Sequence, residues 1–156
     1  MISVDIRDEQ KSCSLNPRVI RAFLKEAIRF LLQGASCRVS VVLVEDAEIA
    51  RLNQRYLGKN HPTDVLAFSM REGKSLSGDT SLLGDVMIST ETARRNARRF
   101  RSSLERELAL YMVHGLLHLL GYEDKTSSQK RRMRGREKEI LRHCMRTVPL
   151  RRLLTS

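Results

Sequence analysis

The sequence contains no tryptophan, and Phe and Tyr together make up only about 4% of its 156 residues. A surface that binds single-stranded bases by stacking needs several exposed aromatic rings, so this type of surface is disfavoured. No apolar run approaches the roughly 20 residues of a membrane-spanning helix. The first residues, MISVDIRDEQK, carry charges where a secretion signal needs an apolar stretch. We therefore expect a cytoplasmic protein with no membrane contact.

Cysteine is also scarce. The three cysteines are Cys13, Cys37 and Cys144, and none of them belongs to a C-x-x-C pair. An odd number without paired spacing argues against a disulfide framework. We expect free thiols that are buried or half-buried.

Acidic residues are the scarcer charge, with 18 Asp and Glu against 29 Lys and Arg, which gives a net charge of +11. Residues 125–152 hold eleven basic residues and only two acidic ones, Glu137 and Glu139. Concentrated, mostly Arg charge attracts phosphates, so RNA or a ribosome is a favoured partner over a merely solvated surface. Backbone contacts should dominate such binding, with weak readout of the base sequence. A second basic cluster comprises Arg94, Arg95, Arg98, Arg99 and Arg101.

The hydrophobic pattern predicts an α+β fold, with a small mixed β-sheet of about four strands packed with about five helices. The length favours a single domain over residues 1–156. The last helix is basic, and we expect a loose tail after about residue 149. The predicted strands are 2–7, 39–44, 65–70 and 82–88; the predicted helices are about 17–33, 46–57, 90–99, 103–120 and 125–145.

Local signals place the starts of these helices. Asn16 before Pro17 is typical of an N-cap followed by proline at the first helical position. Ser102 with Glu105 fits a capping box. Asp46 and either Ser89 or Thr90 are the expected caps of two further helices.

The helix predicted at 103–120 is apolar almost all round, so it should lie in the core. It carries His114 and His118, which at a spacing of four residues share one helix face and can bind one metal ion. Gly121 can turn the chain sharply and bring Asp124 beside them. The string H-x-x-x-H-x-x-G-x-x-D has the ligand spacing of the metzincin zinc helix, with Asp as the third ligand.

Other roles stay open for these residues. A histidine in an apolar helix is often a hydrogen-bonded core residue, and either Glu123 or Asp124 could cap the next helix. We expect His61 and His143 to lie at the surface. Zinc proteases carry a general-base Glu directly after the first histidine, where this chain has Gly115. A basic protein with a metal site and no such carboxylate points to a phosphodiester substrate.

The segment H-G-L-L-H-L-L-G-Y-E-D at 114–124 resembles the signature of the YbeY family of bacterial endoribonucleases and rRNA maturation factors. The segments P-T-D-V-L-A-F at 62–68 and L-G-D-V-M-I-S at 83–89 also resemble that family, and they occur in the family's order. The similarity extends over about residues 49–124.

The resemblance implies a zinc-dependent, single-strand-specific endoribonuclease with one zinc ion per chain. It also implies a role in maturation of the small-subunit (16S) rRNA and in ribosome quality control, with the small ribosomal subunit as a partner. Asp124 stands where the family has its third histidine, and Leu57 stands where it has an arginine. Arg55 or Lys59 could take the role of that arginine as catalytic residues.

Two alternatives remain from the sequence. The protein could be a ribosome-assembly factor whose metal is structural or absent, or, less favoured, a zinc protease. Asp64 and Asp85 are weaker candidates for residues that support the metal site, and both could instead serve turns or strand ends. The nucleophile, either bound water or the RNA 2′-hydroxyl, and the oligomeric state are left open.

Overall fold

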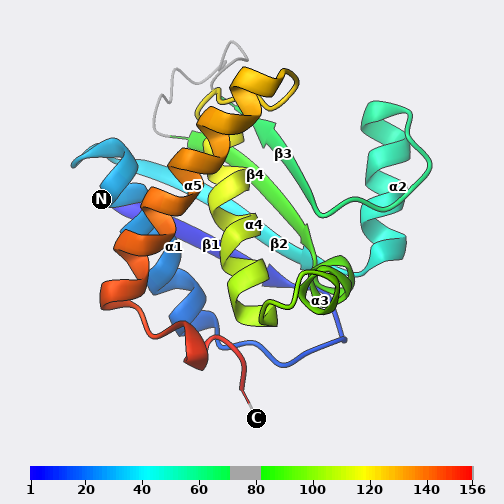
Figure 1. The fold of residues 1–156 in the computed structure, drawn as a ribbon, viewed down its shortest axis with the longest axis horizontal. Coiled ribbons are helices and arrows are strands. Elements are labelled where there is room, and N and C mark those ends of the chain that lie inside the picture. The colour runs from blue at the N-terminus through cyan, green and yellow to red at the C-terminus, as the bar shows by residue number, and fades with distance from the viewer. Residues whose placement is uncertain (71–81, 156) are drawn as a thin grey trace.

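The computed structural model describes residues 1–70 and 82–155, and its centre is a four-stranded sheet in the order β1-β2-β4-β3 (Figure 1). β1 (Ile2–Asp8), β2 (Cys37–Val44) and β4 (Leu82–Ser89) run parallel to one another. β3 (Val65–Ser69) pairs antiparallel with β4 and forms one edge. The mixed sheet confirms the predicted α+β fold.

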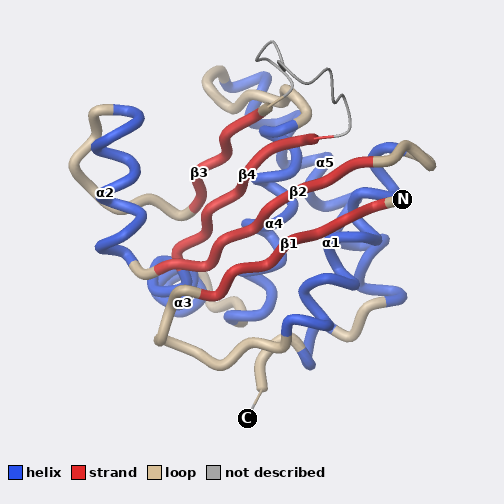
Figure 2. The backbone as a smooth tube through the Cα atoms, turned by 180° about the vertical axis from the view of Figure 1, so that it is seen from behind, coloured by secondary structure: helices blue, strands red, loops and turns tan. Residues whose placement is uncertain are grey.

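The helices are distributed unequally over the two faces of the sheet. α1, α4 and α5 cover one face, while the other face is turned toward the viewer, with α2 beyond β3 (Figure 2). Among the described helices, none is long and apolar enough to cross a membrane. The helices are α1 (Pro17–Leu32), α2 (Asp46–Leu57), α3 (Thr90–Arg99), α4 (Leu104–Leu119), α5 (Ser127–Thr147) and a short 3-10 helix at Leu150–Arg152.

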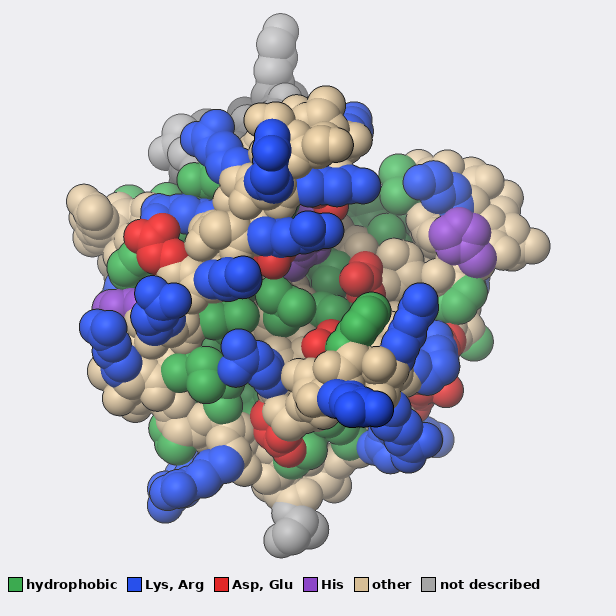
Figure 3. All heavy atoms as spheres, viewed as in Figure 1, with side chains coloured by type: hydrophobic (Ala, Val, Ile, Leu, Met, Phe, Trp, Pro, Cys, Tyr) green, Lys and Arg blue, Asp and Glu red, His purple; other side chains and the backbone are tan. Residues whose placement is uncertain are grey.

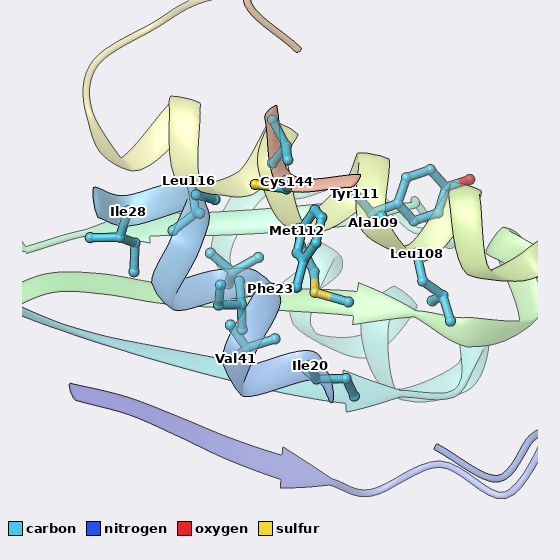
Figure 4. Close-up of a cluster of buried hydrophobic side chains, with 14 of the residues drawn as sticks. Ile20, Phe23, Ile28, Val41, Leu108, Ala109, Tyr111, Met112, Leu116 and Cys144 are labelled. Carbon is cyan, nitrogen blue, oxygen red and sulfur yellow. The ribbon is translucent and has the colours of Figure 1, made fainter. Parts of the chain in front are cut away.

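The main core lies between the sheet and the helices α1 and α4. Phe23 of α1 and Met112 of α4 meet above Val41 of β2 (Figure 4). A smaller apolar cluster on the opposite face joins α2 to the sheet. Cys37 and Cys144 are buried and Cys13 is half-buried, which confirms the burial expected from the sequence.

The helix starts agree with the sequence in part. The Asn16 side chain accepts a hydrogen bond from Arg18 N, and Ser89 caps α3, as predicted. Two other caps were predicted one residue away from their true positions. Ser103, and not Ser102, caps α4, and Glu45, and not Asp46, is the N-cap of α2. Asp46 is engaged elsewhere because the side chains of Ser89 and α3 donate hydrogen bonds to its carboxylate.

The chain after Pro149 is held against the body of the protein. Leu150 and Leu153 are buried in the main core. Asn16 N donates a hydrogen bond to Leu153 O at 2.8 Å, and Thr155 N donates to Ser14 O at 2.9 Å. The expectation of a loose tail is therefore wrong for residues 149–155, because the two leucines bury enough apolar surface to order the segment.

α4 lies unusually close to the sheet at one point. A Cβ atom placed on Gly115 would overlap the Cγ1 methyl of Val86 on β4. Any side chain at this position would therefore push the helix away from the strand. Gly115 fixes both the distance and the rotation of α4 relative to the sheet.

We predict that Gly115→Ala lowers the free energy of unfolding by about 1–3 kcal/mol, because the added methyl group overpacks the contact with Val86. The loss should appear as a fall in Tm of about 2–4 °C per kcal/mol in a thermal melt. Gly135→Ala is the matched control, since a Cβ atom there meets no atom within 4 Å. That control should gain about 0.5–1 kcal/mol from helix propensity. A rise in Tm for both variants would contradict the close packing of α4.

Candidate metal centre

The C-terminal half of the buried helix α4 carries the two predicted histidines. His114 and His118 project from the same face, and their Nε2 atoms lie 3.0 Å apart. Both side chains are mostly buried, with 24% and 29% of their surface exposed. Two nitrogen atoms so close in a partly buried place can share either a proton or a metal ion.

The turn after α4 brings the acidic residue to them. Gly121 has φ +96, a left-handed conformation that a residue with a side chain rarely adopts. Tyr122 N donates a hydrogen bond back to Leu117 O at 3.0 Å, which closes the turn. Asp124 Oδ2 then lies 3.4 Å from His114 Nε2 and 3.5 Å from His118 Nε2.

His114, His118 and Asp124 therefore converge, as the motif predicts. Their three donor atoms lie within 4.8 Å of one another, close enough to hold a single metal ion. No second group of this kind occurs within residues 1–70 and 82–155. The N-cap of α5 is Thr126 and not Asp124, because Thr126 forms a capping box with Gln129 at the start of that helix.

Glu137 is part of the site, although its position in the sequence did not suggest this. It is buried on α5, and its Oε1 lies 2.6 Å from His114 Nδ1. A carboxylate can only accept, so Nδ1 carries the hydrogen and donates it, which leaves Nε2 of the neutral ring free to bind a metal. Such carboxylate–histidine pairs orient metal ligands and raise their basicity. The sequence signal that could have indicated Glu137 is the rarity of acidic residues in the basic segment 125–152.

The surroundings of His114 act on its pKa in opposite directions. Burial lowers the pKa, whereas the hydrogen bond to Glu137 and the negative charges of Glu137, Asp64 and Asp124 raise it. The net result is a pKa above the ordinary value for histidine. Because a metal ion and a proton compete for the same nitrogen, metal binding at this site should weaken in acid.

Two pockets meet at the metal cluster. One has a volume of about 280 Å³ and lies between α4 and α5, where Lys130 and Arg134 line it together with His114. The other has a volume of about 350 Å³ and lies between the edge strand β3 and the turn after α4, where His118 lines it. Asp124 lines both pockets, so the cluster stands at their junction.

The remaining residues named from the sequence lie at various distances from the cluster. Leu57 lines the pocket beside β3, but neither Arg55 nor Lys59 is among the described lining residues of the two pockets. The guanidinium carbon of Arg55 lies 5.4 Å from the centre of the neighbouring Tyr56 ring. The catalytic role of Arg55 and Lys59 stays a prediction.

Of the two acids proposed to support the metal site, one lies near it. Asp64 lines the pocket that contains His114, and it also accepts a hydrogen bond from Val65 N at 2.8 Å. Asp85 lies on β4 between residues that face α4, so it points to the opposite face of the sheet. The suggestion that Asp85 supports the metal is therefore wrong.

The other histidines do not belong to the cluster. His61 is exposed, as expected. His143 is half-buried instead, because its Nε2 pairs with Glu26 Oε1 at 2.9 Å and its ring packs against Phe30.

The fold and the site together define a class of protein. It is a small α+β protein that carries two histidines on a buried helix and a carboxylate from the turn that follows, arranged around a place for one metal ion.

The chain belongs to the YbeY family, because the family model described as Endoribonuclease YbeY matches residues 5–145. A relative from Syntrophus aciditrophicus, named Endoribonuclease YbeY, is 38% identical over 141 residues, which cover 89% of this chain and 88% of the relative. A relative of the same name from Pelotomaculum thermopropionicum is 46% identical over 110 residues, which cover 69% of this chain and 72% of the relative. The solution structure of TM1509 from Thermotoga maritima is 26% identical, with a TM-score of 0.63 over 97% of this chain and 95% of that one.

We predict that Glu137→Gln weakens metal binding about 10- to 100-fold, because the carboxylate that orients His114 is lost. A competition titration against a chelator of known affinity measures the change. Glu139→Gln is the matched control, since Glu139 lies on the same helix and its carboxylate pairs with Arg136. Equal affinities for the wild type and Glu137→Gln would contradict the orienting role.

A second prediction concerns pH. In the metal-free protein, the His114 imidazole should titrate above its ordinary pKa of about 6.5, as followed by NMR. A raised folded-state pKa means that protonation favours the folded state, so this contribution to stability is full below about pH 6.5 and is lost as pH rises through the folded-state pKa. The stability gap between the wild type and Glu137→Gln should therefore narrow as pH rises. A titration midpoint at or below about 6.5 would contradict this prediction.

Proposed function

We propose that the protein is a zinc-dependent endoribonuclease whose metal is held by His114, His118 and Asp124. The observation that carries the proposal is the convergence of these three donor atoms at the junction of two pockets. Three protein ligands leave a fourth position for water or substrate, which is the arrangement of catalytic rather than structural zinc sites.

The spacing of the donor atoms supports zinc as the metal. Tetrahedral zinc with bonds of about 2.0–2.1 Å sets neighbouring ligand atoms about 3.3 Å apart. The separations within the cluster are 3.0, 3.4 and 3.5 Å, close to that value without rearrangement of the chain. Two imidazole nitrogens and one carboxylate oxygen are also a donor set that zinc accepts.

The surroundings of the cluster favour a phosphodiester over a peptide bond. The general-base position of zinc proteases is Gly115 here, and this residue faces Val86 of the sheet, so a carboxylate at this position would not face the metal cluster. A bound zinc ion would polarise a phosphoryl oxygen and lower the pKa of water. Lys130 and Arg134 of the pocket would hold the phosphate by charge, and Glu137 would keep the His114 ring in place.

Single-stranded RNA is the proposed substrate, in maturation of the 16S rRNA and in ribosome quality control at the small subunit. The proposal is supported by the name of the matching family and by the net charge of +11. The charge suits backbone binding, and the low aromatic content argues against tight readout of individual bases.

Cleavage of a single-stranded RNA by the wild type should stop on treatment with a chelator and return on addition of zinc. We predict that His114→Ala and Asp124→Ala each reduce cleavage at least 100-fold, because each removes one metal ligand. His61→Ala should retain full activity, since His61 is exposed and lies outside the cluster.

The outcomes separate the proposed enzyme from its rivals. Cleavage that survives both ligand substitutions would contradict the assigned metal site. Strong binding to the small ribosomal subunit without any metal-dependent cleavage would identify a ribosome-assembly factor instead. Metal-dependent peptide turnover would favour a protease.

A further inference from the structure

Five basic residues recur at every fourth position of α5: Lys130, Arg134, Lys138, Arg142 and Arg146. We call them the α5 basic row. All five side chains are exposed, and none forms an ion pair within residues 1–70 and 82–155. Figure 3 shows Lys and Arg side chains gathered over the face of the molecule to which α5 belongs. The row is therefore a set of charges that have no ion-pair partner in the part of the chain that the structure describes.

Four other charged residues of α5 have partners outside the row: Arg132, Arg136, Glu137 and Glu139. Arg136 pairs with Glu139 at 2.8 Å, and its guanidinium carbon lies 5.4 Å from the centre of the Phe30 ring on α1. Arg132 lies over the Tyr122 ring at 5.3 Å. Glu137 is turned inward onto His114. Both acids of this helix are thus engaged elsewhere, and neither neutralises the row.

The row begins at the metal centre. Lys130 and Arg134 line the pocket that contains His114 and Asp124. The other three members, from Lys138 onward, line another pocket of about 410 Å³, in which Arg106 of α4 is the facing cation. The row therefore follows the seam between α4 and α5 away from the metal, toward the start of α4.

The spacing of the row suits a nucleic-acid strand. Four helical residues rise by about 6 Å, which is similar to the separation of neighbouring phosphates along an extended strand. The whole row spans about 24 Å, enough for about five phosphates of such an extended strand. Long exposed Lys and Arg side chains can adjust to such a backbone without reading its bases.

We propose that single-stranded RNA runs along the α5 basic row, on one side of the phosphate that is held at the metal centre. The inference rests on the proposed endoribonuclease function for the identity of the strand. It adds the direction of the bound strand, because the α5 basic row extends from the metal pocket only along the seam between α4 and α5. Nucleotides on one side of the cut would contact the row, and nucleotides on the other side would not.

Removal of row charges should weaken RNA binding in a way that depends on salt. Each phosphate contact to a single strand contributes about 0.7 to the slope of log K against log salt concentration. The triple variant Lys138→Gln, Arg142→Gln, Arg146→Gln should lower the slope by about 2 and weaken binding roughly 100-fold at about 0.1 M salt. These three residues lie away from the metal ligands, so metal content should not change.

The binding experiment measures the affinity for a 2′-O-methyl RNA of about ten nucleotides, so that the measurement does not depend on RNA cleavage. A gel run afterwards checks that the RNA is intact. The matched control is Arg98→Gln, Arg99→Gln, Arg101→Gln, which removes the same charge from exposed residues at and after the end of α3. The control should keep most of the affinity. Equal losses in the two triple variants would overturn the proposal, because net charge alone would then explain binding. Unchanged binding in the α5 variant would also overturn it.

The length experiment tests the direction. Substrates are extended by up to about five nucleotides on either side of the wild-type cleavage position. Extension on one side should raise kcat/KM until the row is filled, and the α5 triple variant should lose this gain while keeping its activity on the shortest substrate. A gain on both sides, or a gain that the variant retains, would overturn the proposal. Absence of cleavage in every protein would instead count against the endoribonuclease function, and the binding experiment would still test the row.

Discussion

The packing of α4 between the sheet and α5 determines where the metal ligands can lie. The helix is apolar on most of its surface, and Gly115 allows it to approach Val86 so closely that it has little freedom to rotate. With that face held against the sheet, His114 and His118 are directed toward α5 and the turn that follows α4. The same packing brings Glu137 of α5 within hydrogen-bond distance of His114. The packing of the core therefore determines the positions of the metal ligands.

The charged residues of this protein have two roles, attraction of a polyanion and binding of a metal cation. A net charge of +11 attracts a polyanion, but it would also repel a metal cation from the same surface. The two carboxylates Asp124 and Glu137 reverse the local field where a cation must bind, one as a donor atom and one through His114. The α5 basic row begins at the edge of this acidic site. A metal centre and a polyanion surface can thus lie side by side without cancelling each other.

Much of the fold and of the candidate site could be predicted because their signals are local. The spacing of His114 and His118, the glycine at 121 and the acid at 124 all lie within eleven residues of one chain segment, where helix geometry alone fixes their relation. Glu137 could not be found in this way, because its contact with His114 depends on how α5 packs against α4. The order of the tail was missed for the same reason, since Leu153 is buried only by tertiary contacts. The caps Ser103 and Glu45 differ by one residue from the predicted positions, where neighbouring polar residues offer similar local chemistry.

The convergence of three side chains on one metal ion is most directly tested by anomalous diffraction at the zinc edge, from crystals of the protein grown with zinc. The expected result is one peak per chain, within about 2.0–2.2 Å of the Nε2 atoms of His114 and His118 and of a carboxylate oxygen of Asp124. A peak bound by other residues, or a zinc-saturated protein with no peak between these three side chains, would contradict the metal centre described for this chain.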